Sequence, residues 1–394
     1  MIANENTVAS ADSGVVATAA VDSFYPRARL WLGITSVGSI VMVCALGVMF
    51  EADLWFDKIA IGPRYGELEA LGWFVAFFIL LGLPFDLIGG RFLPLAHGRP
   101  VPPLSVFTLA LTRGVLIHGV MLFASAVGFM HSLRIGGWPA AIAFFSVGML
   151  LLAATQRFWA KLIGGLREEE DRSPALKRTS GTMASIEDGY AGGITGIPGL
   201  ERIDLPARWR QEWPAAQIQL ALERRRFAVR SGLYLKGLAM AFAWNLAGSA
   251  VAGLIIGIPE GRVGEVVEFS FLITLWNFLG LLILPTASRN AVIAMDREMI
   301  RQGHAPDALA WLAADCARLQ DGEISRNERV ETFFHPIPSL EQRWIGLETP
   351  ANPFAGWNVS RQMLYLSWPL LGMVSRAVHG SVGRPALWVM PPAD

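Results

Sequence analysis

Three consecutive arginines, Arg224, Arg225 and Arg226, precede by two helical turns a stretch that is apolar enough to enter a bilayer. Guanidinium groups at such a boundary bind lipid phosphates and mark the side of the membrane on which a loop remains. The chain has 33 basic and 33 acidic residues, so no net charge attracts nucleic acid. We therefore expect membrane lipids, and no nucleic acid, among its partners.

Four polar residues lie inside apolar segments, where an unpaired polar group is costly. Asn245 in WNLAG and Asn277 in WNFLG lie at similar depths in neighbouring segments, so the two amides are predicted to bond each other. Asp86 and Arg113 lie towards the ends of two other segments and are predicted to form an ion pair. Both pairs are interpreted as structural. A binding role for the asparagines and a proton path through Asp86 and Arg113 are the alternatives.

The other residues that could do chemistry form no recognisable site. His118 lies inside an apolar segment, where a hydrogen bond to a neighbouring helix is expected and haem or chlorophyll ligation is the alternative. Cys44 and Cys316 are expected to pack in the interior without pairing or binding metal. The run GYAGGITGIPG lacks the Lys-Ser/Thr and the preceding strand of a phosphate-binding loop. No cofactor is expected.

Composition identifies the elements that must carry these residues. The chain has 394 residues, of which 53% are hydrophobic and 17% charged, which is too apolar for an ordinary soluble domain. A membrane span needs about 20 largely apolar residues. Six segments meet this requirement, namely 30–50, 70–89, 105–129, 138–156, 233–258 and 266–284.

The basic residues of the loops predict the orientation of these spans. One side has few of them, Lys58, Arg64, Arg134 and Arg262. The other side has the cluster at 221–230 together with Arg91, Arg99, Arg157, Lys161, Arg167, Arg289, Arg297 and Arg301. This bias predicts a multi-pass protein of a bacterial inner membrane, with both termini and both large polar regions in the cytoplasm.

The chain is divided by these segments into successive regions. Residues 1–28 are predicted to be a flexible tail, 29–157 a four-span region and 158–214 an exposed cytoplasmic loop. A helix is expected after Pro214 and is predicted to continue into the fifth span. Residues 348–394 are predicted to be a tail with an interfacial or re-entrant segment at 363–374 and an exposed, Pro-rich end.

Residues 215–347 resemble a known enzyme family. In order along the chain, YLKG, PTASRNAVIAMDREMIRQGH and FFHPIPSLEQRWIGL are similar to motifs of the integral membrane zinc metallopeptidases of the CAAX prenyl protease class. The resemblance implies a helix bearing HExxH before a pair of spans. It also implies a Glu ligand four residues before an Asp on the helix that follows the second span, and a late His-Pro pair followed by Arg.

The zinc chemistry implied by this resemblance needs two histidines one helical turn apart, a general-base Glu between them and a third carboxylate ligand. Anchored on YLKG and on Ser288–Arg289, the resemblance assigns these four positions to Arg224, Ala228, Arg225 and Val292 in that order, and it matches the family Asp to Asp296. The residues between His131 and His304 contain no histidine. We therefore interpret the site as degenerate, with guanidinium charge in place of the metal and paired with Asp296 or Glu223.

The sequence analysis predicts an all-α polytopic membrane protein with about six transmembrane helices and a cytoplasmic helical layer, in which 215–347 is a degenerate metallopeptidase-like region with two spans. The expected function is that of a non-catalytic accessory or scaffolding subunit of a larger membrane complex. Its expected partners are other integral membrane subunits, and the chain is expected not to be an enzyme. An active membrane peptidase with an unrecognised site and a small-molecule transport or binding protein are the alternatives.

Overall fold

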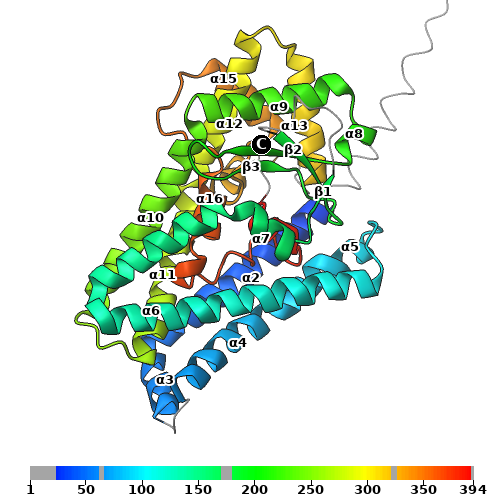
Figure 1. Ribbon diagram of the computed structural model, residues 1–394. Coiled ribbons are helices and arrows are strands. Elements are labelled where there is room, and N and C mark those ends of the chain that lie inside the picture. Colours follow the sequence, from blue (N-terminus) through cyan, green and yellow to red (C-terminus); the bar gives the residue numbers. More distant parts are fainter. Residues whose placement is uncertain (1–23, 62–65, 170–179, 321–325, 392–394) are drawn as a thin grey trace, which may run out of the picture.

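The computed structural model describes residues 24–61, 66–169, 180–320 and 326–391, and most of the predicted tail at 1–28 lies outside them. Five helices of the described chain are long and apolar enough to cross a membrane. They lie below a layer of shorter helices and strands (Figure 1). These helices are α2 (Phe24–Met49), α4 (Gly66–Leu87), α6 (Leu104–Ala154), α10 (Leu233–Ile256) and α11 (Val263–Ile283).

The longest helix contains two of the six predicted spans. α6 has 51 residues, and its backbone leaves the helical region at Gly136 and Gly137. Gly137 has φ 58° and ψ −149°, a conformation that is open almost only to glycine, and Pro139 follows it. The third and fourth predicted segments are therefore the two arms of one bent helix.

Short helices connect and extend the spans. α3 (Ala52–Ala60) joins α2 to α4, and a π-helical turn, η1 (Ile88–Phe92), and α5 (Leu93–Ala96) extend α4. α11 begins where the Glu265 carboxylate accepts hydrogen bonds from the backbone N–H groups of residues 260–262, which satisfies donors at the helix start.

A layer of helices covers one end of the spans (Figure 1). Prolines precede or begin three of them, Pro214 before α9, Pro285 in α12 and Pro306 in α13, where a missing N–H does no harm. α9 does not continue into the fifth span as predicted, because Gly232 takes φ 76° and separates it from α10. The members are α7 (Gln156–Leu162), α8 (Trp209–Glu212), α9 (Ala215–Arg230), α12 (Pro285–Arg301), α13 (Pro306–Leu319), α14 (Glu328–Phe334) and α15 (Leu340–Glu348).

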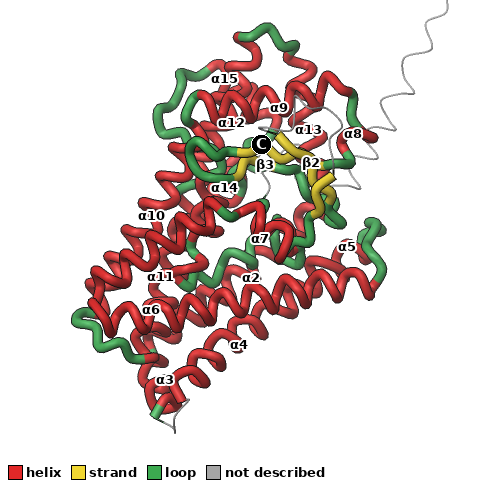
Figure 2. The backbone as a smooth tube through the Cα atoms, in the orientation of Figure 1, coloured by secondary structure: helices red, strands yellow, loops and turns green. Residues whose placement is uncertain are grey.

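A small sheet replaces much of the exposed loop predicted at 158–214. Its order is β1-β2-β4-β3, with β2 and β4 parallel and the other pairs antiparallel. Ile194, Ile203 and Leu205 are buried against the helical layer, so the Gly-rich run is interior. Figure 2 shows the strands against the helices. The strands are β1 (Arg167–Glu169), β2 (Ser180–Ala184), β3 (Gly193–Thr195) and β4 (Arg202–Pro206).

The C-terminal segment, residues 355–391, is buried almost throughout. It contains α16 (Val359–Leu366), the 3-10 turn η2 (Trp368–Leu370) and α17 (Pro385–Val389), and it passes among the spans. A Cβ added to certain glycines of the spans would come within 2.2–2.8 Å of this segment. They are Gly33, Gly90, Gly114, Gly148, Gly237 and Gly280, opposite His379, Gly383, Pro385, Pro369, Trp357 and Met363 respectively.

This burial corrects the predicted tail at 348–394. Residues 363–374 are part of the protein interior, so of the two predicted forms, interfacial and re-entrant, the interfacial one is wrong, and Trp388 near the Pro-rich end is 2% exposed. The sequence pattern failed because a short apolar run broken by Pro369 cannot span a bilayer but can fill the space between helices that do.

Candidate functional site

Arg224, Asp296 and Arg343 form a buried ionic network between α9, α12 and α15. Arg224 Nη2 lies 2.7 Å from Asp296 Oδ1, and Arg343 Nη1 lies 3.2 Å from Asp296 Oδ2. All three side chains are at most 5% exposed. One carboxylate thus bridges two guanidinium groups, and the predicted pair of Arg224 with Asp296 is present.

The neighbouring positions named by the resemblance have different surroundings. Arg225 donates to the backbone oxygens of Asp204 (3.0 Å) and Ala191 (2.7 Å), and thereby ties α9 to the sheet. Ala228 and Val292 belong to the apolar core of the helical layer. Glu223, the alternative partner for the arginines, has its Oε2 atom 2.9 Å from His304 Nε2.

The residues at the four positions that the resemblance assigns to the zinc site cannot bind zinc. Zinc sites are built from imidazole, thiolate and carboxylate ligands. Arg224, Arg225, Ala228 and Val292 supply none of these, and the carboxylate of Asp296 is held by two guanidiniums. Within the described ranges, no three or more His, Cys, Asp or Glu side chains are grouped so that they could hold a metal ion.

The predicted polar pairs inside the membrane are not formed as expected. Asn245 Nδ2 donates to the backbone oxygen of Met363 at 3.0 Å, and it is Trp276 Nε1 that joins the two Asn-bearing helices, through Trp244 O at 2.9 Å. The Asn277 side chain has no hydrogen-bond partner among the described residues.

Asp86 and Arg113 are also separated. Asp86 forms an ion pair with Arg376 and accepts from the backbone N–H of Gly383 at 2.9 Å, whereas Arg113 Nε donates to Ile163 O at 3.4 Å. The partners of Asp86 lie in the C-terminal segment. The signal that could have found them is the presence of Arg361 and Arg376 in an otherwise apolar stretch.

His118 faces the same segment. Its ring lies 4.5 Å from that of Trp368 between centroids. Neither ring nitrogen has a hydrogen-bond partner among the residues that the structure describes, so the expected bond to a neighbouring helix is not seen there. Cys44 and Cys316 are both buried, and neither forms a disulfide with a described residue.

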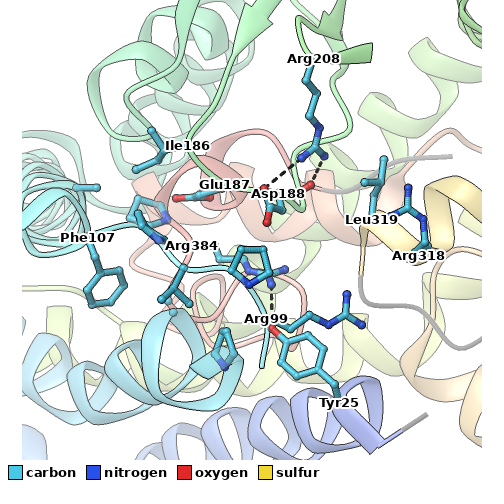
Figure 3. A pocket seen from close by; sticks show the side chains of 18 of the residues that line it. Tyr25, Arg99, Phe107, Ile186, Glu187, Asp188, Arg208, Arg318, Leu319 and Arg384 are labelled. Atoms are coloured by element: carbon cyan, nitrogen blue, oxygen red, sulfur yellow. Dashed lines mark hydrogen bonds and ion pairs between the residues drawn. The ribbon is translucent and has the colours of Figure 1, made fainter. Parts of the chain in front are cut away.

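A cavity of about 500 Å³ lies where α5, the loop between β2 and β3, α13 and the C-terminal segment meet (Figure 3). Arg384 Nη2 donates to Tyr25 Oη at 3.2 Å, and the Arg99 guanidinium lies 5.0 Å from the centre of the same ring. Arg208 pairs with Asp188 at 3.4 Å. The charges of the lining balance, with the arginines Arg99, Arg208, Arg318 and Arg384 against the acidic residues Glu187, Asp188, Glu212 and Asp315.

Glu187 is the most perturbed group of this cavity. Burial raises the pKa of its carboxyl from 4.5 to about 7, against the lowering effect of hydrogen bonds from the start of α17 and of the Arg384 charge. Both carboxylate oxygens lie 3.2 Å from the backbone nitrogen of Ala386. A carboxyl that exchanges its proton near neutral pH can act as a general acid or base. The sequence analysis missed Glu187, because no motif surrounds it.

Comparison with known proteins places this architecture. No family model and no curated protein matches the sequence. Among solved structures, the crystal structure of S. mikatae Ste24p matches with a TM-score of 0.63 at 12% sequence identity, and the match covers 84% of this chain and 98% of that one. The chain therefore has the polytopic, mostly helical membrane fold of Ste24p, a CAAX prenyl protease.

This comparison contradicts one prediction. The chain was expected not to be an enzyme, and its likeness to Ste24p, which is an active protease, contradicts that expectation. The prediction rested on residue types at four aligned positions, and the likeness extends over most of the chain. At 12% identity the likeness establishes the fold alone.

Proposed function

We propose that this chain serves as an accessory or scaffolding subunit of a larger membrane assembly, built on the Ste24-like fold. The observation that carries the proposal is the Arg224–Asp296–Arg343 network, in which Arg224 occupies one of the four positions that the resemblance assigns to the zinc site. A buried carboxylate between two guanidiniums joins three helices as a fixed element, and none of the four assigned residues is of a type that binds zinc.

Exposed aromatic side chains support a role in assembly. Trp55 of α3 is 69% exposed and Trp73 of α4 is 61% exposed, and the two helices pack side by side. Tryptophan is enriched both at protein interfaces and at the boundaries of bilayers. In this proposal the protein lies in a bacterial inner membrane with both termini in the cytoplasm, and this face contacts another integral membrane subunit.

Gentle solubilisation and affinity purification of the full chain test this role. We expect one or more integral membrane proteins to co-purify in a fixed ratio, and the double substitution Trp55→Ala/Trp73→Ala to lower their yield. Phe158→Ala is a matched control, since Phe158 is 55% exposed on α7, a helix that lies away from α3 (Figure 1). Recovery of the wild type as a lone monomer would refute the proposal.

A membrane peptidase is the second candidate function, and the likeness to Ste24p favours it. Incubation of the purified chain with a prenylated CAAX peptide tests it directly. Cleavage that a metal chelator abolishes would establish this function and would place the metal ligands outside the four aligned positions. The absence of cleavage in a preparation that retains its thermal stability would count against it.

A further inference from the structure

A second cavity, of about 240 Å³, lies between α2 and α11 and shares no lining residue with the Glu187 cavity. Its walls are apolar side chains of the two spans and of α14. Those from the spans include Leu30, Ile34, Val37, Phe278, Leu281 and Leu282. The cavity is smaller than the ~300–1,000 Å³ of typical ligand sites, so it suits a slender apolar chain.

The lining of this cavity also includes polar residues. Ser360, Arg361 and His379 of the C-terminal segment line it. Arg361 is 5% exposed, and its Nη1 atom is buried without a hydrogen-bond partner among the described residues. Ser360 Oγ is buried and unbonded in the same way, within the same limits. Two residues that line a mainly apolar cavity thus each have a buried polar atom without a hydrogen-bond partner among the described residues.

A buried guanidinium is unfavourable unless an anion or hydrogen-bond acceptor compensates it. Arginine stays protonated at any ordinary pH, so deprotonation does not remove the charge. Planar oxyanions such as carboxylate or phosphate match its geometry best. The compensating group that this site lacks is therefore an anionic oxygen at the end of an apolar chain.

We propose that this cavity binds a lipid-like molecule with one apolar chain and an anionic oxygen head group. The head group contacts Arg361 and Ser360, and the chain lies between α2 and α11. This site goes beyond the proposed scaffolding role and does not depend on it.

A substitution at Gly38 can block binding of the ligand's apolar chain without disturbing the fold of the protein. It lines the cavity, and a Cβ at this position meets no atom within 4 Å. Gly38→Leu therefore fills the cavity with little strain. Gly72→Leu is the matched control, since Gly72 lies on another span, outside this cavity, and its Cβ would meet only Phe123 at 4.0 Å.

The experiment measures binding of radiolabelled palmitate to the purified, delipidated full chain at one fixed concentration of neutral detergent. We expect saturable binding that unlabelled palmitate displaces and that methyl palmitate, which lacks the charge, does not. Arg361→Met should weaken binding at least about tenfold, as expected for a lost charge-assisted contact, and Gly38→Leu should abolish it. Gly72→Leu should bind like the wild type.

A second readout separates binding from misfolding. Palmitate should raise the melting temperature of the wild type but not that of Arg361→Met. Without ligand, Arg361→Met should be at least as stable as the wild type, because it removes an uncompensated buried charge. Displacement by the single-chain phospholipid lysophosphatidylglycerol would identify a phospholipid as the natural source of the apolar chain, and displacement by palmitate alone would identify a free acid. Equal displacement by methyl palmitate, or wild-type binding by Arg361→Met and Gly38→Leu, would overturn the proposal.

Discussion

At the scale of single residues, charge compensation explains the arrangement of the helical layer. Asp296 has one negative charge and contacts two buried guanidiniums. Breaking such a buried arrangement is far more damaging than replacing it as a whole, because the remaining charges stay desolvated. The network is therefore a structural joint whose members depend on one another.

The first prediction concerns this joint. Asp296→Asn keeps the shape of the side chain but leaves Arg224 and Arg343 uncompensated, so it should lower the stability of the protein by about 3–5 kcal/mol. Thermal unfolding in detergent measures the change. The triple substitution Arg224→Met/Asp296→Leu/Arg343→Met should restore most of the loss. Asp307→Asn, at an exposed position, is the control and should change stability by no more than about 1 kcal/mol. A harmless Asp296→Asn would show that the network is not needed.

The second prediction concerns pH. The pKa of Glu187 is raised in the folded state to about 7, so the folded protein binds a proton that the unfolded chain releases near pH 4.5. Proton binding by Glu187 therefore stabilises the folded protein fully below pH 4.5. As the pH rises from 4.5 to 7, this stabilisation, about 2–4 kcal/mol, is lost.

Glu187→Gln should remove that pH dependence while its amide oxygen still accepts from Ala386. Melting temperatures of the two proteins at pH 5 and pH 8 test this. The wild type should lose more stability than the variant between the two values. Parallel behaviour would contradict the raised pKa.

The sequence predicted residue pairs well only where both partners lay in recognised motifs. The pair of Arg224 with Asp296 followed from the resemblance. Asp86 was correctly identified as needing a cation, but Arg376 lies 290 residues away in a segment predicted to be a tail. Neither spacing nor periodicity carries information about such a distant partner.

At the scale of elements, glycines control how closely the spans approach the C-terminal segment. Gly114 of α6 faces α17, and a Cβ there would lie 2.8 Å from Pro385 Cβ and 3.1 Å from Trp388. The Pro385 ring and the Trp388 indole are rigid, buried groups, so they have little space in which to move.

Gly114→Val should therefore displace α17, with a loss of about 1–3 kcal/mol from overpacking. Limited proteolysis measures the displacement as faster cleavage within the C-terminal segment, and thermal unfolding measures the loss of stability. Gly72→Val is the control, because a Cβ added at Gly72 would meet only Phe123, at 4.0 Å. Equal protease resistance of the two variants would contradict close packing at α17.

The elements were predictable to different degrees. Length and apolarity alone located all six predicted spans, although two of them form the arms of α6. The sheet was missed because its strands have only three to five residues each and are separated by glycines and prolines. Such short strands depend on tertiary burial and not on local periodicity.

At the scale of the whole molecule, the C-terminal segment completes the interior. It provides hydrogen-bond and ion-pair partners for Asn245 and Asp86 and packs against glycines of every span. Its residue Arg361 lines the cavity between α2 and α11. A Ste24-like fold at 12% identity shows that the arrangement of helices persists when most side chains differ. Apolarity predicted the membrane spans, but only the folded chain shows what fills the space between them.

The central claim is that side-chain charge, and not a metal, holds α9, α12 and α15 together. Metal analysis of the purified wild type tests it most directly. The account predicts less than stoichiometric zinc and an unchanged melting temperature after treatment with a chelator. One zinc per chain, whose removal lowers the melting temperature and abolishes cleavage of a prenylated peptide, would contradict it.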